Sequence, residues 1–228
     1  MGFDLFGGGI AAPAFGACHL AEVVSVQDPE SLARVQVRLL GFDGVGEQDA
    51  PVWARVASPF AGAEKGGFFI PDVGDEVLVV FVNGDPRFPI VAGGLWSGAN
   101  KPPESLPGSS VDRWTIKSKG GSRIAIVEES SPTITIETPG GVTGTFTDEG
   151  GGKVEIKAAG TTVTIDSKGV TVDSPGKVKM TCSQLEVSAG MVKVDAAMST
   201  FSGMVKCDIL QATTVIGSTY TPGAGNVW

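Results

Sequence analysis

Three carboxylates that stand close together are the first residues in this sequence that could do chemistry. Asp72, Asp75 and Glu76 lie in the segment PDVGDEV, and paired carboxylates can serve acid–base catalysis or bind a metal ion. A structural role fits them better. Asp-Glu after Val-Gly is typical of a turn that enters a strand, where Asp75 can accept hydrogen bonds from nearby backbone amides. We interpret Asp85-Pro86 as a second turn in the same way.

The residue types needed for nucleophilic or metal chemistry lack their usual partners. His19 is the single histidine of the chain, so any Ser-His-Asp triad would have to use it. No cluster of histidines is available to bind zinc. Cys18, Cys182 and Cys207 lie far apart, and their odd number argues against a disulfide framework. We therefore predict no catalytic site, no metal and no cofactor, and we do not expect an enzyme.

Positive charge is scarce and gathers at one place. Lys117, Lys119 and Arg123 form a local basic cluster, which we interpret as a solvated face or, at most, a contact with an acidic surface of a partner. The chain has 17 Lys and Arg against 25 Asp and Glu, a formal net charge of −8. Such a chain offers no basic stripe to neutralise phosphates, so nucleic acid is not an expected partner.

Short strands separated by turns are the elements that must position these residues. The 33 glycines and 14 prolines, with abundant Val and Thr, predict an all-β protein. Val35, Val37 and Leu39 alternate with polar residues, as in a half-buried strand. Five or six such strands predict a barrel of the OB type in residues 18–97. The expected strands are 19–26, 33–40, 52–58, 75–82 and 89–96, with a short apolar element at 66–71.

Two further segments flank the barrel. Residues 98–112 contain three prolines and almost no core material, so we interpret them as a linker. Residues 1–17 are apolar and rich in glycine, and we interpret them as an N-terminal arm. They lack the positively charged start of a secretory signal, so we expect a soluble chain.

Residues 113–228 consist of short segments with a period of two, beginning with Ile124 and Ile126. From residue 163 to residue 192 the first members of successive pairs are 7 or 8 residues apart, which favours a β-helix. One chain cannot enclose so narrow an apolar stripe, whereas three chains wound into a triangular prism can bury it. We predict an intertwined homotrimer with the core residues Val163, Ile165, Val170, Val172, Val178, Met180, Leu185, Val187, Val192, Val194, Val205, Cys207 and Ile209.

Several segments resemble phage baseplate assembly protein V and the VgrG-type spikes of type VI secretion and related contractile systems. They are DPE at 28–30 followed by ARVQVRLLG, WARVASPFAG at 53–62, GGFFIPDVGDEVLVVFVNGDPRFPIVAGGLW at 66–96, RWTIKSKGGSRI at 113–124 and the closing PGAGNVW. The resemblance implies a homotrimer whose OB barrels sit on a hub ring and whose β-helix points towards the target membrane.

The resemblance also implies partners and a location. The chain has no long hub domain before the barrel and no lysozyme domain after it, so we expect the hub to be a separate baseplate protein. An inner tube and a PAAR-type tip cap are further expected partners, with transient contact to the target cell envelope. The expected location is the baseplate of a virion tail or phage-like particle, assembled in the cytoplasm of the producing cell. We expect Tyr220, Val227 and Trp228 at the tip, as an apolar plug or a platform for the cap.

The sequence thus predicts a structural central spike that pierces an envelope mechanically, and two alternatives remain. The first is a VgrG-type spike that carries effectors in a bacterial secretion system. The second is a β-helical glycan-degrading tail protein, which needs paired acids and aromatic platforms. Residues 115–219 contain only the aromatic residues Phe146 and Phe201, which disfavours the second alternative.

Overall fold

The computed structural model describes residues 18–42 and 50–219, and these residues form strands and short 3-10 turns without an α-helix. The all-β prediction is therefore confirmed. The chain divides into two compact units, Met1–Lys177 and Val178–Trp228. Within the described ranges no helix is long and apolar enough to cross a membrane.

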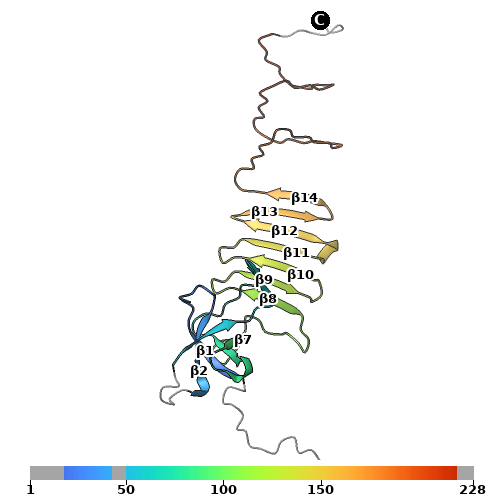
Figure 1. Ribbon diagram of the computed structural model, residues 1–228. Helices are drawn as coiled ribbons and strands as arrows, with labels where there is room; N and C mark the ends of the chain where they lie inside the picture. Colours follow the sequence, from blue (N-terminus) through green and yellow to red (C-terminus); the bar gives the residue numbers. More distant parts are fainter. Residues whose placement is uncertain (1–17, 43–49, 220–228) are drawn as a thin grey trace, which may run out of the picture. The chain divides into compact units, whose positions relative to one another are not determined.

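The first five long strands close into a barrel (Figure 1). They follow the order β1-β2-β3-β7-β6 around the barrel, and the one parallel pair, β3 with β7, completes the circle. Closure leaves no free sheet edge and gives the predicted OB-like architecture. The bounds are β1 (His19–Ser25), β2 (Val35–Leu39), β3 (Val52–Val56), β6 (Glu76–Phe81) and β7 (Pro89–Leu95).

The barrel core follows from the alternation in the sequence. Val35 and Val37 on β2 are fully buried, together with Val77 and Val79 on β6. Between the core residues Ala21 and Val23 of β1, Glu22 points outward and pairs with Arg38 at 2.7 Å. The predicted inward and outward faces of β2 are therefore confirmed.

The barrel has five strands, and residues 66–71, expected as a short apolar element, do not add a sixth. Only the short hairpin β4 (Ala61–Gly62) and β5 (Lys65–Gly66) forms in this region. Phe68 and Phe69 have no ladder partner, and their exposed fractions are 79% and 62%. The physical reason is that the five-stranded barrel is already closed, so it has no free edge to pair with this segment.

Seven strands follow as an antiparallel meander in sequence order (Figure 1). Segments of five residues connect β8 to β12, and segments of two residues connect β12 to β14. The strands are β8 (Arg113–Lys117), β9 (Arg123–Val127), β10 (Thr133–Glu137), β11 (Thr143–Thr147), β12 (Lys153–Ala158), β13 (Thr161–Asp166) and β14 (Gly169–Asp173).

The second unit contains no strand within residues 178–219 when the chain stands alone. The strands predicted there, at 178–180, 185–187, 192–194 and 205–209, run as single chain segments with bends between them. A segment with two or three apolar residues and no neighbouring strand cannot form a ladder. The predicted β-helix requires other copies to pair with and stays a prediction.

Candidate functional site

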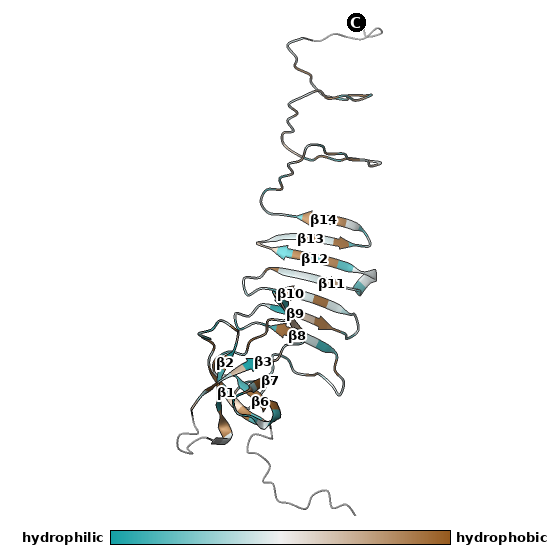
Figure 2. Cartoon of the chain, in the orientation of Figure 1, coloured by the Kyte–Doolittle hydropathy of each residue, from teal (hydrophilic) through white to brown (hydrophobic). Residues whose placement is uncertain are grey.

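The seven-stranded sheet places its large apolar side chains on one face, in two columns that cross all seven strands. Direct pairing in each antiparallel step keeps each column straight, and alternate residues of a strand share a face. The first column is Ile116, Ile124, Ile136, Gly144, Ile156, Val163 and Val172. The second column is Trp114, Ile126, Ile134, Phe146, Val154, Ile165 and Val170. Figure 2 shows brown, hydrophobic segments along strands of this sheet.

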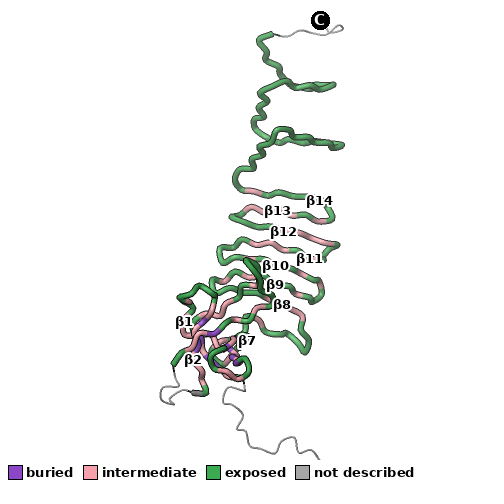
Figure 3. Tube along the Cα trace, viewed as in Figure 1, coloured by how far each residue is buried: buried purple, intermediate pink, exposed green. Residues whose placement is uncertain are grey.

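In this sheet the apolar residues are more exposed than the polar residues, the reverse of a sheet that covers its own core. On β10, Ile134 and Ile136 have exposed fractions of 43% and 47%, whereas Thr133, Thr135 and Glu137 on the opposite face are partly buried. Figure 3 shows the sheet as a mixture of exposed and intermediate positions, with the fully buried positions concentrated in the barrel. A contiguous apolar surface of this kind marks an interaction site.

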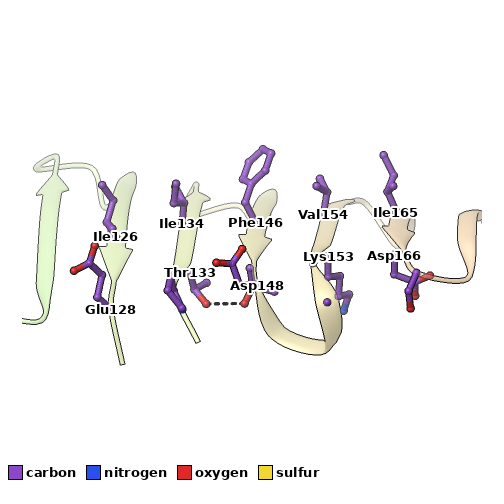
Figure 4. Close-up of a pocket in the computed structure, with 15 residues that line it drawn as sticks. Ile126, Glu128, Thr133, Ile134, Phe146, Asp148, Lys153, Val154, Ile165 and Asp166 are labelled. Atoms are coloured by element: carbon purple, nitrogen blue, oxygen red, sulfur yellow. Dashed lines mark hydrogen bonds between the residues drawn. The ribbon is translucent and has the colours of Figure 1, made fainter. Parts of the chain in front are cut away.

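The middle of the second column lines an open groove (Figure 4). Ile126, Ile134, Phe146, Val154 and Ile165 come from five successive strands, and their side chains point to the same side of the sheet. Nothing in this row offers a nucleophile or a proton carrier. This row can therefore bind apolar side chains, while Glu128, Asp148, Lys153 and Asp166 also line the groove.

The opposite face of the sheet is polar and internally paired. Lys153 and Lys157 contact the carboxylate of Glu155 at 2.8 and 2.5 Å, and these two hydrogen bonds lower the pKa of Glu155. The hydroxyl of Thr133 donates to that of Thr147 across the sheet at 3.0 Å. Such a face is suited to water, which leaves the apolar face as the surface that needs a partner.

The linker lies on this polar face. Arg123 donates to Glu104 at 2.7 Å, and the Thr115 hydroxyl donates to the same carboxylate at 3.0 Å. These contacts, with Arg123 the larger cause, lower the pKa of Glu104. The chain thus covers part of its own polar face, next to the buried Ala125, and leaves the apolar columns open.

Two members of the basic cluster form ion pairs within the chain, although the side chain of Lys119 remains exposed as expected. Arg123 pairs with Glu104, as above, and Lys119 pairs with Asp72. The hydrogen bond from Lys119 lowers the pKa of Asp72. Lys117 is exposed. The sequence could not reveal these pairs because their partners are distant along the chain.

The carboxylates considered for chemistry have structural partners. Asp75 accepts a hydrogen bond from the backbone amide of Asp72 at 2.8 Å, which confirms its predicted role in the turn. Arg87 donates to Asp85 at 2.6 Å, and this contact lowers the pKa of Asp85 to about 2. Across residues 18–42 and 50–219 no group of three or more His, Cys, Asp and Glu is placed to hold a metal ion.

Asp28 is a structural centre that the sequence did not single out. Its carboxylate accepts hydrogen bonds from Arg34 at 2.6 Å and from the backbone amides of Glu30, Leu32 and Arg34 at 2.9 to 3.2 Å. The hydrogen bond from Arg34 and the backbone amides hold the pKa of Asp28 far below its usual range. This network shapes the connection between β1 and β2, and the turn residues around Pro29 were its only sequence signal.

The predicted core residues fall into three groups. Val163, Ile165, Val170 and Val172 lie in the two columns, on β13 and β14. The residues predicted from Val178 to Ile209 lie in the second unit and are exposed in a single copy, including Cys207. Tyr220, Val227 and Trp228 lie outside the described residues. The predicted set begins at Val163 and so omits the column positions on β8 to β12.

His19 and two of the cysteines lie in different settings. His19 lies in β1, where its ring meets that of Phe81 edge-on at a centroid distance of 5.4 Å. Cys18 and Cys182 are free thiols and exposed in the single chain. These positions fit a structural part in the barrel and in the second unit.

The barrel and the sheet can now be compared with known proteins. Residues 19–96 match the family model of the Type VI secretion system/phage-baseplate injector OB domain. This match covers the five-stranded barrel from the first residue of β1 to just beyond the end of β7. It confirms the resemblance to injector proteins for this part of the chain.

The similar proteins include spike proteins of type VI secretion systems and a toxin. The chain is 47% identical over 103 residues to the spike protein VgrG3 of Vibrio cholerae, covering 42% of this chain and 10% of VgrG3. It is 45% identical over 69 residues to the spike protein VgrG4b of Pseudomonas aeruginosa, covering 30% and 8% of the two chains. The actin cross-linking toxin VgrG1 of Vibrio cholerae is 42% identical over 62 residues, covering 27% and 6%. The match thus spans no more than 10% of the length of these three relatives.

Proposed function

We propose that three copies of this chain form the central spike of a contractile injection machine, which pierces the envelope of a target cell mechanically. The observation that carries the proposal is the exposed apolar face of the β8–β14 sheet in a single copy. The similarity of the barrel to injector OB domains and of the chain to VgrG spikes gives that face its biological setting.

Three copies can cover this face with no other partner. If three sheets form the walls of a prism, the apolar columns of all three face a common interior and the polar faces meet water. A cyclic arrangement closes after three copies, so no apolar surface is left over. The extended segments of residues 178–219 carry the same kind of apolar residue and can continue the prism by pairing between copies.

A prism of this kind serves a mechanical task. Its walls are hydrogen-bonded strands, and its outer surface is rich in Thr, Lys and Glu, which limits adhesion during passage through an envelope. The barrel end is proposed to sit on a hub protein of the baseplate. A tip cap and an inner tube complete the proposed set of partners.

The nature of the machine has two candidates, a phage tail and a bacterial secretion system. The matching family model covers both, and the relatives named above belong to secretion systems. The cross-linking activity in the name of VgrG1 belongs to that protein, of which the matched segment is 6%. We propose a structural role in either machine.

Native mass spectrometry of the full chain tests the trimer. We expect a particle of about 70 kDa, three times the chain mass of 23.3 kDa. Ile134→Asp places a charge on the apolar face and should abolish the trimer. Thr135→Asp, one residue away on the polar face, is the matched control and should leave it intact. A wild-type chain that remains at 23.3 kDa at micromolar concentration refutes the proposal.

The piercing role needs a test in assembled particles. We expect that removal of residues 178–228 from the chain in a producing strain leaves particles that assemble but no longer permeabilise target cells. Dye entry into target cells and electron microscopy of the particles separate the two effects. Full permeabilisation by particles that carry the shortened chain would contradict the mechanical role.

A further inference from the structure

One position in the two apolar columns has no side chain. The columns have fourteen positions, and thirteen carry Ile, Val, Trp or Phe. The fourteenth is Gly144 on β11, between Ile136 and Ile156 in the first column. Two residues further along the same strand, Phe146 occupies the second column with an exposed fraction of 44%. The layer formed by β11 therefore combines the smallest residue of the face with one of its two aromatic residues.

The backbone does not require glycine at position 144. Gly144 lies within β11, is paired directly with Ile136 and Ile156, and does not have a positive φ. A Cβ atom added at Gly144 would meet nothing within 4 Å in the single copy. Glycine weakens a strand interior, and it often marks a place where another group approaches closely. The reason for this glycine therefore lies outside the single copy.

A cyclic trimer defines which group approaches. In a ring of three copies every interface is head-to-tail, so one side of a sheet meets the opposite side of the next sheet. The first column of each copy then faces the second column of its neighbour at each corner of the prism. At the level of β11 this brings Phe146 of one copy to Gly144 of the next.

We propose that Phe146 of each copy occupies the space above Gly144 of the adjacent copy, and that this contact fixes the register of the three copies. The proposal rests on the proposed trimer. The other layers pair Ile or Val with Ile, Val or Trp, so a slip by one strand changes little in most of them. At β11 a slip would press Phe146 against Ile136 or Ile156 and leave the space at Gly144 empty.

Register has a consequence for assembly. A head-to-tail contact that is displaced along the axis does not close and instead continues as an open spiral. Because Phe146 and Gly144 fit only at one level, they favour the closed trimer over the spiral. This gives the glycine a function that offsets its cost to the strand.

A cysteine cross-link tests the contact between copies. The full chain is prepared with Cys18→Ser, Cys182→Ala and Cys207→Ala, so that only introduced thiols react. With Gly144→Cys and Phe146→Cys added, mild oxidation should convert at least half of the chains into a covalent trimer on a denaturing gel. Thr143→Cys with Thr145→Cys has the same spacing on the polar face and should yield uncrosslinked chains. Equal yields for the two pairs overturn the proposal.

An exchange of the two residues tests their complementarity. Gly144→Leu and Phe146→Ala should each shorten the half-life of the trimer in denaturant at least tenfold. The combined variant Gly144→Phe with Phe146→Gly restores one large and one absent side chain per corner, and should recover most of the lost half-life. A combined variant no more durable than the single variants refutes the proposed fit.

The control for both experiments is the mass of the wild-type particle under native conditions, which shows whether the chain is a trimer or a monomer. A monomeric wild-type chain refutes the proposed function itself. A trimeric wild-type chain whose half-life is unaffected by Gly144→Leu refutes only the register contact and leaves the trimer standing.

Discussion

Shortening one side chain of the apolar face should weaken the trimer by an amount that can be worked out from the single copy. Ile136 stands in the first column and retains an exposed fraction of 47% in the isolated chain. If the trimer buries that remainder, about 85 Å² per copy leaves water, worth about 2 kcal/mol per copy and about 6 kcal/mol per trimer. Ile136→Ala should lose most of this, in keeping with about 2 to 5 kcal/mol for such truncations in a closed core.

The assay is denaturant-induced dissociation of the full chain at several protein concentrations. The wild-type midpoint should rise with concentration, because dissociation releases three copies. Ile136→Ala should lower the midpoint at every concentration. Thr135→Ala, the adjacent residue on the polar face, should change the free energy by no more than about 0.5 kcal/mol per copy. Equal effects of the two substitutions would refute the assignment of the apolar face to the interior.

Three further predictions concern the elements that support the face. Val37→Ala removes part of a fully buried side chain in the barrel and should lower the free energy of unfolding of the barrel by about 2 kcal/mol, measured in urea. Asp28→Asn should lower the thermal midpoint of the barrel at pH 7. The pKa of Asp28 is depressed in the folded state by Arg34 and backbone amides, so the stabilisation is fully present above about pH 4 and is lost as the pH falls. The difference from the wild type should therefore narrow below pH 4, and a constant difference from pH 2 to pH 7 would contradict the argument. Ala159 has a φ of 49° beside Gly160 at 81° in the turn between β12 and β13, so Ala159→Asn should relieve strain of about 1 kcal/mol per copy and raise the thermal midpoint.

The barrel could be predicted because its signals are local. On β2, Val35 and Val37 alternate with Gln36 and Arg38, and a period of two is enough to assign the faces of a strand. The turn role of Asp75 was equally accessible, since its partner amide is three residues away. Local patterns could not decide whether the segment with Phe68 and Phe69 adds a sixth strand, because closure of the barrel by β3 and β7 is a property of the whole domain.

The ion pairs and the column structure could not be predicted because they depend on distance in space. Lys119 and Asp72 are 47 residues apart, and nothing in either segment indicates the other. The apolar pairs of the second half were recognisable, but their arrangement into two columns depends on the in-register pairing of seven strands. Each of the other strands carries two apolar residues two positions apart, but β11 has Gly144 in place of the first. The sequence pattern therefore did not indicate that Phe146 belongs to the same face.

The end of the ladder after β14 shows why the second half needs more than one copy. Between β8 and β14 most reversals include a residue with positive φ, among them Gly121, Gly141 and Gly160, whereas the reversal at 128–132 includes none. Each reversal lets the next strand pair with the last. Beyond Asp173 no described residue has a positive φ, glycines included, and the bends at 183, 190 and 197 recur every seven residues. Within residues 178–219 the chain provides no paired strand of its own, so its backbone amides and carbonyls must pair with water or with another chain. Because its Val, Leu and Met side chains are exposed at the same time, pairing with other copies satisfies both requirements at once.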